Sequence, residues 1–310
     1  MIIYRELSSL EKDLGFSAKA LYGASYHRHE HYHPAKVPKG NGEFRELCVP
    51  DEFLKTIQRR IADRLLVYEE ISPFATAYRP GSSTLVNATP HVGKPVLLKL
   101  DIRHFFDHII YPMVKGKAFP AERYSESNRI LLSMLCIYKD ALPQGAPTSP
   151  AISNIIMREF DNTVGTWCLS KDITYTRYCD DMTFSGDFET CEVIRFVKDE
   201  LGKLGLFLND KKTVVLRGGQ KKAVTGIVVN EKPNVSAAYR RKLRQELYFC
   251  QKYGLDEHIH RLGLDVFAPQ YAMQLLGRIN YVLQITPDNA EMRQYKEWLL
   301  QKRPHFQNLH

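Results

Sequence analysis

The chain has 310 residues, of which 44% are hydrophobic and 25% are charged, an ordinary composition for a soluble globular protein. Lys and Arg number 43 against 35 acidic residues, and the resulting formal net charge of +8 favours a polyanionic partner such as nucleic acid. Gly and Pro are too few for a disordered chain, and no apolar run approaches the about 20 residues that a membrane helix needs. These features exclude disordered and membrane-spanning classes, and the length allows two domains.

Six cysteines are spread along the chain, and no two are spaced as C-x-x-C, so neither a zinc knuckle nor a redox motif is expected. Scattered thiols of this kind more often serve as small buried hydrophobes than as bridges. The first residues also lack the apolar stretch that marks a secretion signal. We therefore expect a reduced protein that works in the cytoplasm and has no membrane partner.

Three tyrosines and four histidines cluster within residues 22–33. The alternation of His29, His31 and His33 is compatible with a metal site, but alternate residues more often share one face of an extended segment. Contact with RNA or substrate is the better functional interpretation, because aromatic and imidazole faces stack on bases. The role of this cluster stays open.

Residues 44–50 (FRELCVP) predict a strand, and apolar residues from Phe53 to Leu66 recur at helical spacing. The polar face of that helix is basic, which indicates either a solvated surface or one that follows a nucleic-acid backbone. The loop 77–84 then places Arg79 beside Gly81 and two hydroxyls. This loop suits a phosphate, because small residues let backbone N–H groups approach an oxyanion, although such loops are common.

An apolar run at 96–102 predicts a buried strand that carries Asp101 at its end, and helix-like spacing follows at 105–110. An ionised carboxylate is unusual in a core strand unless it is paired or binds metal. Farther on, the proline-rich loop 141–150 leads into a helix, for which we predict Ser149 as the N-cap and Pro150 as the first residue. Gln144 and Gly145 would then lie on a rigid turn suited to touching a ligand.

Residues 173–178 and 182–185 alternate like two strands of a β-hairpin, with Asp180 and Asp181 at or beside its tip. Two adjacent carboxylates repel each other, and a cation between them would relieve that repulsion. An amphipathic helix, a turn with Lys211 and Lys212, and a predicted strand at 224–230 follow. The pattern is helical after Pro233, so we place a domain boundary near that residue.

If the strand of Asp101 and the hairpin of Asp180 and Asp181 are neighbours in one antiparallel sheet, three carboxylates converge at one end of it. Three hard oxygen donors without His or Cys suit Mg²⁺ rather than zinc. Two such ions about 4 Å apart activate an attacking hydroxyl and stabilise a departing oxygen, so two-metal nucleotidyl transfer is the natural reaction. A nuclease could use the same triad, so the triad alone does not separate synthesis from cleavage.

Four motifs in order favour synthesis over cleavage, because together they resemble the motifs of reverse transcriptases. LKLDIRHFF (98–106) resembles the first catalytic motif, and LPQGAPTSP (142–150) the template- and nucleotide-binding motif. YCDD (178–181) is similar to the catalytic hairpin and LGLFLNDKKT (204–213) to the lysine-bearing motif that follows it. Asn87-Ala-Thr-Pro-His91 and Val224-Thr-Gly226 resemble the N-A-x-x-H and V-T-G elements of the retron branch. The likeness covers about residues 40–300, and Cys179 stands where retron enzymes often have Ala.

The resemblance implies an α+β right-hand polymerase with fingers and an antiparallel palm over residues 1–232 and a helical thumb over 233–310. It implies two Mg²⁺ ions held by Asp101, Asp180 and Asp181, with the Ile102 carbonyl as an extra ligand. Further roles carried over by position are the hairpin residues Tyr178 and Cys179, the nucleotide-binding residues Arg79, Phe106 (the steric gate against a ribose 2′-hydroxyl), Gln144, Gly145 and Lys212, and the nucleic-acid-binding residues Asn87, His91, Arg240, Arg241, Lys242 and Arg244.

The retron likeness also implies partners. Such enzymes use deoxynucleotides and a noncoding RNA encoded beside them, and they prime from the 2′-hydroxyl of an internal guanosine. The product is a branched RNA–DNA hybrid (msDNA), which many systems pair with an effector protein in anti-phage defence. Two alternatives stay open: another bacterial reverse transcriptase of group II intron-like or defence-associated type, and an RNA- and DNA-binding scaffold that restrains an effector.

Overall fold

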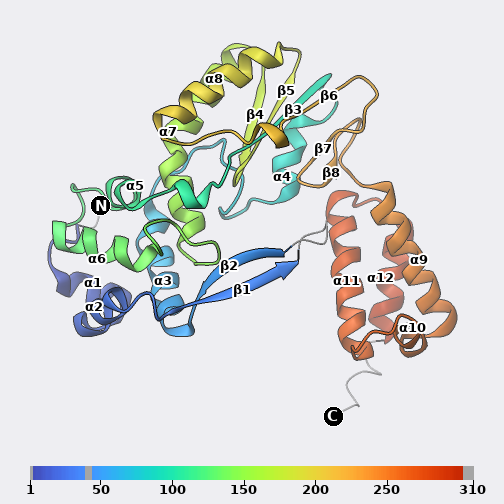
Figure 1. Ribbon diagram of the computed structural model, residues 1–310. Coiled ribbons are helices and arrows are strands. Elements are labelled where there is room, and N and C mark those ends of the chain that lie inside the picture. Colours follow the sequence, from blue (N-terminus) through green and yellow to red (C-terminus); the bar gives the residue numbers. More distant parts are fainter. Residues whose placement is uncertain (1–2, 39–43, 303–310) are drawn as a thin grey trace. The chain divides into compact units, whose positions relative to one another are not determined.

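The computed structural model describes residues 3–38 and 44–302. The chain forms two compact units (Figure 1). The first unit is built from the residues up to Ser83 together with Pro95–Arg217, and the second from Thr84–Lys94 and the chain from Gly218 onward.

The amino-terminal part of the first unit is helical except for one hairpin. The hairpin pairs β1 (Tyr32–Pro38) with β2 (Phe44–Pro50), which confirms the strand predicted at 44–50. The predicted helix that follows is also present, and it begins where the Asp51 carboxylate accepts a hydrogen bond from the Leu54 amide at 2.9 Å. The helices of this part are α1 (Leu7–Leu14), α2 (Ala18–Tyr26), α3 (Glu52–Arg64) and the short η1 (Leu66–Tyr68).

A four-stranded antiparallel sheet lies at the centre of the first unit, in the strand order β4-β5-β3-β6. Its strands confirm the predicted buried strand and the predicted hairpin: β3 (Val96–Asp101), β4 (Thr174–Tyr178), β5 (Asp181–Gly186) and β6 (Val214–Arg217). Strand β3 is interior because it pairs with both β5 and β6; β6 pairs with its residues 96–99, and Asp101 at its end pairs with β5. An interior strand gives little freedom to the residue at its end.

Helices α7 and α8 lie side by side against this sheet, with the rings of Trp167 and Phe196 stacked 4.3 Å apart (Figure 1). The apolar face of α7 is buried as its spacing predicts. The remaining elements of the first unit are the short turns η3 (Phe106–His108), α5 (Tyr111–Met113), η4 (Val114–Ala118) and η5 (Asp210–Lys212), and the helices α6 (Glu126–Cys136), α7 (Ser149–Ser170) and α8 (Thr190–Lys203).

Two local predictions for this unit are wrong. The N-cap of α7 is Thr148 rather than Ser149, because the Ser149 hydroxyl donates instead to the Pro143 carbonyl at 2.8 Å and Ser149 itself is helical. The helix-like spacing at 105–110 corresponds to a single 3₁₀ turn, Phe106–His108. The Ile109 amide closes that turn on the Phe106 carbonyl at 3.2 Å, and Ile109 then has an extended backbone that ends it.

The second unit joins a small sheet to a group of helices. The strand predicted at 224–230 is instead a hairpin of two short strands, because Thr225 and Gly226 have positive φ angles of 45° and 86° and turn the chain. The carboxy-terminal part is helical after Pro233, as predicted, apart from one short strand. The elements are α4 (Thr84–Ala88), η2 (Thr89–His91), β7 (Ala223–Val224), β8 (Ile227–Val228), β9 (Asn234–Val235), α9 (Ala237–Tyr253), α10 (Leu255–Arg261), α11 (Ala268–Ile285) and α12 (Ala290–Lys302).

The division of the chain differs from the predicted boundary near residue 233. Residues 218–232 and the separate segment 84–94 belong to the compact unit that contains the carboxy-terminal helices. The link is direct, since the Gly93 amide donates to the Val229 carbonyl at 2.9 Å. Across residues 3–38 and 44–302, no helix is both long enough and apolar enough to span a bilayer.

Candidate active site

The central sheet pairs two aspartates that are far apart in the sequence. Asp101, the last residue of β3, is the register partner of Asp181, the first residue of β5. Asp180 precedes it in the turn, and its carbonyl accepts a hydrogen bond from the Ile102 amide at 3.0 Å. The strand pairing therefore gathers Asp101, Asp180 and Asp181 at one end of the two interior strands, the arrangement predicted from the motifs (this end of the strands is called the edge that carries the aspartates).

Two side chains from the segment after α8 engage the carboxylate of Asp101, which is buried. The Lys212 ammonium donates to its Oδ2 at 2.7 Å, and the Asn209 amide donates to its Oδ1 at 3.2 Å. The Asn209 backbone amide also donates to the Asp101 carbonyl at 2.8 Å. The hydrogen bond to Asp101 is the main cause that raises the pKa of Lys212, so this lysine is held in its charged form beside the carboxylates.

The negative charges of the three aspartates repel one another, which makes ionisation of all three carboxyl groups unfavourable. Loss of hydration and then the adjacent charge of Asp180 raise the pKa of the Asp181 carboxyl, and Asp101 adds to the effect. Among the residues that the structure describes, no group of three or more His, Cys, Asp or Glu side chains is arranged to hold a metal ion. The sheet thus sets the three carboxylates beside one another, and the Asp101 side chain is turned to Lys212.

The turn between β4 and β5 is tightly held. Cys179 is buried and has a left-handed backbone, with φ of 61°. Its sulfur accepts a hydrogen bond from the Tyr78 hydroxyl at 3.4 Å, and its carbonyl accepts one from the Arg177 guanidinium at 2.8 Å. A left-handed turn residue is strained in an L-amino acid and persists where its surroundings determine it, as these two bonds do.

The turn that carries Gln144 and Gly145 leans on the hairpin strand β2. The Gln144 carbonyl accepts a hydrogen bond from the Cys48 amide at 2.9 Å. Gly145 has φ of 118°, and a Cβ at this position would approach the Cys48 carbonyl oxygen to 3.2 Å. Both the positive φ and the close approach favour glycine at this position. The rigidity predicted for this turn stays a prediction.

Arg79 precedes strand β3 in the sequence, and Phe106 follows it. Phe106 begins the 3₁₀ turn after β3 and is half-buried, with its ring centre 5.3 Å from that of Phe105. Arg79 is also half-buried, and its guanidinium donates to the carbonyls of Ser72 and Ala75 at 3.4 and 3.3 Å. The steric-gate and triphosphate roles of these two residues stay predictions.

Asn87 and His91 lie together in the second unit, and both are buried. The Asn87 amide donates to the Thr225 hydroxyl at 3.4 Å, and that hydroxyl donates to the Thr84 carbonyl at 3.1 Å. The two retron-like elements are therefore in contact, with Asn87 of the first steadying the positive-φ residue of the second. Direct binding of nucleic acid by Asn87 or His91 stays a prediction.

Burial of His91 predicts acid sensitivity. Loss of hydration, with a smaller effect of Lys94, lowers the pKa of His91 from 6.5 to about 4. The unfolded chain then binds the proton more readily than the folded protein between pH 6.5 and 4. The stabilisation by neutral His91 is complete above pH 6.5 and is lost as the pH falls toward 4, by about 3 kcal/mol in total. We expect the free-energy difference between wild type and His91→Gln, measured by urea unfolding, to shrink over this window.

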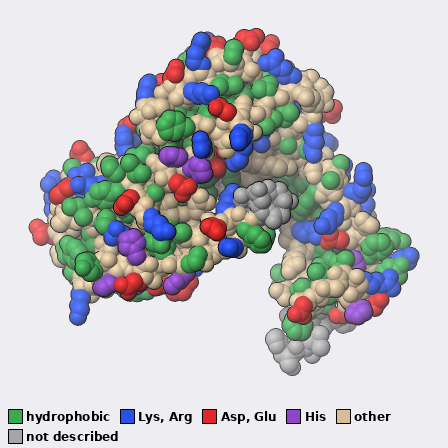
Figure 2. Space-filling view, viewed as in Figure 1, with side chains coloured by type: hydrophobic (Ala, Val, Ile, Leu, Met, Phe, Trp, Pro, Cys, Tyr) green, Lys and Arg blue, Asp and Glu red, His purple; other side chains and the backbone are tan. Residues whose placement is uncertain are grey.

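The basic helix predicted for the thumb is α9, and Figure 2 shows Lys and Arg side chains gathered along it. Arg241 and Lys242 are exposed and form no ion pair with any described residue. Arg244 pairs with Glu291 of α12 at 2.6 Å, and Arg240 donates to Asn234 at 3.3 Å. Of the four predicted contacts, Arg241 and Lys242 are thus the two most open to a phosphate.

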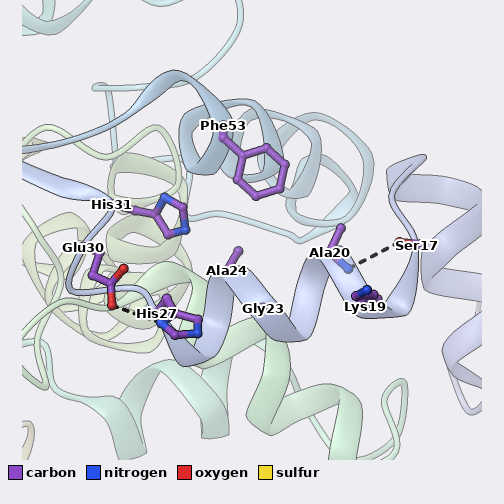
Figure 3. A pocket seen from close by; sticks show the side chains of 9 residues that line it. All are labelled: Ser17, Lys19, Ala20, Gly23, Ala24, His27, Glu30, His31 and Phe53. Atoms are coloured by element: carbon purple, nitrogen blue, oxygen red, sulfur yellow. Dashed lines mark hydrogen bonds and ion pairs between the residues drawn. The ribbon is translucent and has the colours of Figure 1, made fainter.

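Two histidines of the His and Tyr cluster, His27 and His31, line a hollow of about 530 Å³ between α2 and the start of α3 (Figure 3). Both histidines are paired with acids: His27 with Glu30 at 3.0 Å and His31 with Asp51 at 2.7 Å. The small residues Ala20, Gly23 and Ala24 and the ring of Phe53 supply the apolar surface of the hollow. No metal cluster is found here among the described residues, and RNA contact by the cluster stays a prediction.

Comparison with known proteins assigns the family. The model of the family described as reverse transcriptase (RNA-dependent DNA polymerase) matches residues 37–236. The retron Mx65 reverse transcriptase of Myxococcus xanthus is 33% identical, over 93% of this chain and 70% of the relative. The retron Ec86 reverse transcriptase of Escherichia coli is 29% identical, over 83% of this chain and 82% of the relative. The chain belongs to the retron-type reverse transcriptases.

This reverse transcriptase is an RNA-directed DNA polymerase, and its partner is an RNA template. Its mixed architecture with a central antiparallel sheet is that of a right-hand polymerase, as predicted. Telomerase from Candida albicans, solved in complex with a fragment of telomeric RNA, has a TM-score of 0.46 and 13% identity, over 86% of this chain and 64% of that chain. A likeness of that degree carries no argument about function.

Sequence reasoning missed several residues that hold the site of this reverse transcriptase. Asn209 bonds both the backbone and the side chain of Asp101. Arg177 and Asp161 form a fully buried ion pair of 2.6 Å next to the hairpin turn. A charged residue inside an alternating strand and another within an apolar helix were the available signals, since unpaired charges are rarely buried.

Proposed function

We propose that this reverse transcriptase is the polymerase of a retron and copies a cognate noncoding RNA encoded beside it. Synthesis starts from the 2′-hydroxyl of an internal guanosine and gives a branched RNA–DNA hybrid (msDNA). Two kinds of observation support the proposal: retron enzymes of two bacteria align over most of the chain, and the two retron-like elements are bonded to each other through Asn87 and Thr225.

The observation that carries the chemistry is the register of Asp101 with Asp181 at the edge that carries the aspartates, with Asp180 beside them. All the charged ligands at this edge are carboxylates, the donor type that Mg²⁺ prefers, and like charges this close favour a bound cation. By the chemistry of these donors, two Mg²⁺ ions would be held by Asp101, Asp180 and Asp181, with the Ile102 carbonyl as an extra ligand. When bound, such ions activate the attacking hydroxyl and neutralise charge on the leaving pyrophosphate.

The protein's own residues then position the reactants. Lys212, which is charged and hydrogen-bonded to Asp101, is proposed to assist the leaving pyrophosphate. Arg79 is proposed to contact the incoming triphosphate, and Gln144 and Gly145 to line the template and nucleotide site on their turn. In-line transfer needs positioning and charge neutralisation rather than a nucleophilic side chain.

The same proposal assigns parts of the chain to the lobes of the polymerase. Residues 1–232 are proposed as fingers and palm, and 233–310 as the thumb. In the thumb, exposed Arg241 and Lys242 on α9 track the template–primer backbone, and Arg240 and Arg244 support them. A cytoplasmic location, an effector protein and a role in anti-phage defence complete the retron proposal.

Sequencing of the nucleic acid that co-purifies with the protein tests this proposal. We expect one RNA species covalently joined to DNA, with the DNA released by a debranching enzyme that cleaves 2′,5′ linkages. Co-purified DNA that is linear and not joined to RNA would instead identify another type of bacterial reverse transcriptase. RNA without any attached DNA would favour a scaffold.

Phe106→Ala tests the steric gate. The ring follows Asp101 by five residues and is half-buried, and we propose that it borders the sugar of the incoming nucleotide, so that its loss removes this barrier. We expect the ratio of kcat/KM for deoxynucleotides to that for ribonucleotides to fall at least about tenfold, since shape alone sets this discrimination. Phe105→Ala on the buried neighbouring ring is the control, and unchanged sugar selectivity in Phe106→Ala would remove the gate role.

A further inference from the structure

The buried guanidinium of Arg177 joins three parts of the first unit. Its Nε and Nη2 donate to the two carboxylate oxygens of Asp161 on α7, at 2.8 and 2.6 Å. Its Nη2 also donates to the Asn154 side-chain oxygen at 3.1 Å, and its Nη1 donates to the Cys179 carbonyl at 2.8 Å. Both charged side chains are fully buried, and Asp161 accepts a further bond from the Tyr175 hydroxyl at 2.8 Å.

The bond to Cys179 acts on the catalytic hairpin. The Cys179 carbonyl belongs to the peptide group that links Cys179 to Asp180, so the guanidinium fixes the plane of the peptide that leads into the aspartate pair. On the other side of the turn, the Asp180 carbonyl accepts from Ile102, the residue after Asp101. The backbone of the turn is therefore held from both sides, in a conformation that it would not adopt unaided.

A second set of bonds acts on the loop that carries Tyr78 and Arg79. The Arg177 amide donates to the Phe74 carbonyl at 2.8 Å, and the Thr76 amide donates to the Arg177 carbonyl at 2.8 Å. The Asn154 side-chain amide donates to the Ala77 carbonyl at 2.9 Å. Residues 74–77 are thus held by the main chain of residue 177 and by the Asn154 side chain, whose oxygen accepts a hydrogen bond from the Arg177 guanidinium.

We propose that Arg177 is a positioning residue for nucleotidyl transfer, holding the catalytic hairpin and the Arg79 loop in a single fixed geometry. This inference rests on the proposed active site. Stability alone does not explain why an ion pair occupies this position, because replacing a buried ion pair with well-packed apolar residues often leaves the folding free energy unchanged or improves it. Reaching Asp161, Asn154 and Cys179 at once requires a planar fork of donors, which arginine has and lysine lacks.

Arg177→Lys tests the proposal, because the ammonium keeps the charge opposite Asp161 but cannot reach all three acceptors. We expect kcat to fall about 100-fold, the typical effect of misplacing reacting groups by about 1 Å. Asn154→Ala removes the bond to Ala77 and leaves the Cys179 bond in place, so we expect a raised KM for deoxynucleotides with kcat near that of wild type. Equal kcat and KM in Arg177→Lys and wild type would overturn the proposal.

Two further variants separate positioning from stability. Arg123→Lys alters another buried arginine, paired with Glu69 in the same unit, and should lower the melting temperature while leaving kcat unchanged. The double variant Asp161→Leu with Arg177→Met removes both buried charges together, so stability should largely return while kcat stays low. Recovery of kcat together with stability, or an equal loss of kcat in Arg123→Lys, would show that the role is structural only.

Hydrogen exchange gives a readout that does not depend on polymerase activity. In Arg177→Lys we expect faster exchange confined to the Thr76 and Ile102 amides, whose acceptors are the carbonyls of Arg177 and Asp180, relative to Arg123→Lys. Exchange equal to that of Arg123→Lys at these amides would overturn the inference. If wild type makes no DNA, the proposed function fails, and this comparison still decides whether Arg177 holds the two segments.

Discussion

Replacing Asp180 and Asp181 together with Asn is expected to abolish DNA synthesis, lowering the rate of nucleotide addition by at least about 10³-fold. The substitution keeps the size of both side chains but removes the charge that holds the cations, and the metal ions are worth several kcal/mol of transition-state stabilisation. The fold should persist, because burial and then the neighbouring charge of Asp180 raise the pKa of Asp181, and a neutral Asn removes both penalties on the charged form. Primer extension on a short RNA template measures the rate, and a filter-binding assay with the same RNA checks that binding is retained.

The control is Asp187→Asn, an exposed acid just beyond β5, which should extend primers at the wild-type rate. The same double variant also separates an enzyme from a scaffold in cells that carry the whole system. A scaffold keeps its biological effect without DNA synthesis, whereas we expect phage protection to disappear with the activity. Extension at near wild-type rate by the double variant would contradict the assignment of the site itself.

Asp161→Ala is expected to destabilise the first unit by about 3–5 kcal/mol, because it leaves the Arg177 guanidinium buried without a counter-charge. The same substitution removes the acceptor of the Tyr175 hydroxyl and of the Nε and Nη2 atoms of Arg177. Urea unfolding followed by circular dichroism measures the free energy, and the melting temperature should fall by roughly 10 °C.

Glu159→Ala is the matched control, since Glu159 lies on the same helix and pairs with Lys117 at 2.5 Å on the surface. An exposed pair of this kind contributes little, so the unfolding free energy should change by less than about 1 kcal/mol. Similar losses in the two variants would mean that burial does not set the strength of the Arg177 pair.

Much of the candidate site could be predicted because each motif combines a local pattern with a chemical anomaly. Asp101 ends an apolar run and Asp181 begins an alternating one. The sequence therefore predicts both strands and the end of each strand that carries the aspartate. Pairing such strands in one antiparallel sheet then sets Asp101 opposite Asp181. Lys212 was also predicted, but its bond to Asp101 was not.

Local patterns failed where a distant group changed the outcome. Ser149 is a good N-cap by type, but its hydroxyl is used by the Pro143 carbonyl, and the helix begins at Ser149 itself. The apolar run at 224–230 has strand composition, but Thr225 and Gly226 turn it, and Thr225 bonds the Thr84 carbonyl of a segment 141 residues away.

The sequence by itself determined the family, the three carboxylates, the strands that carry them and the basic helix, because periodicity and motif spacing are properties of neighbouring residues. Only the tertiary structure decided the partner of Arg177, the anchoring of Asp101 by Asn209, and the union of 84–94 with the carboxy-terminal unit. These depend on which groups meet after folding, when a buried charge or donor must find a partner from whatever element packs beside it. The spacing of residues along the chain therefore does not predict which groups pair after folding.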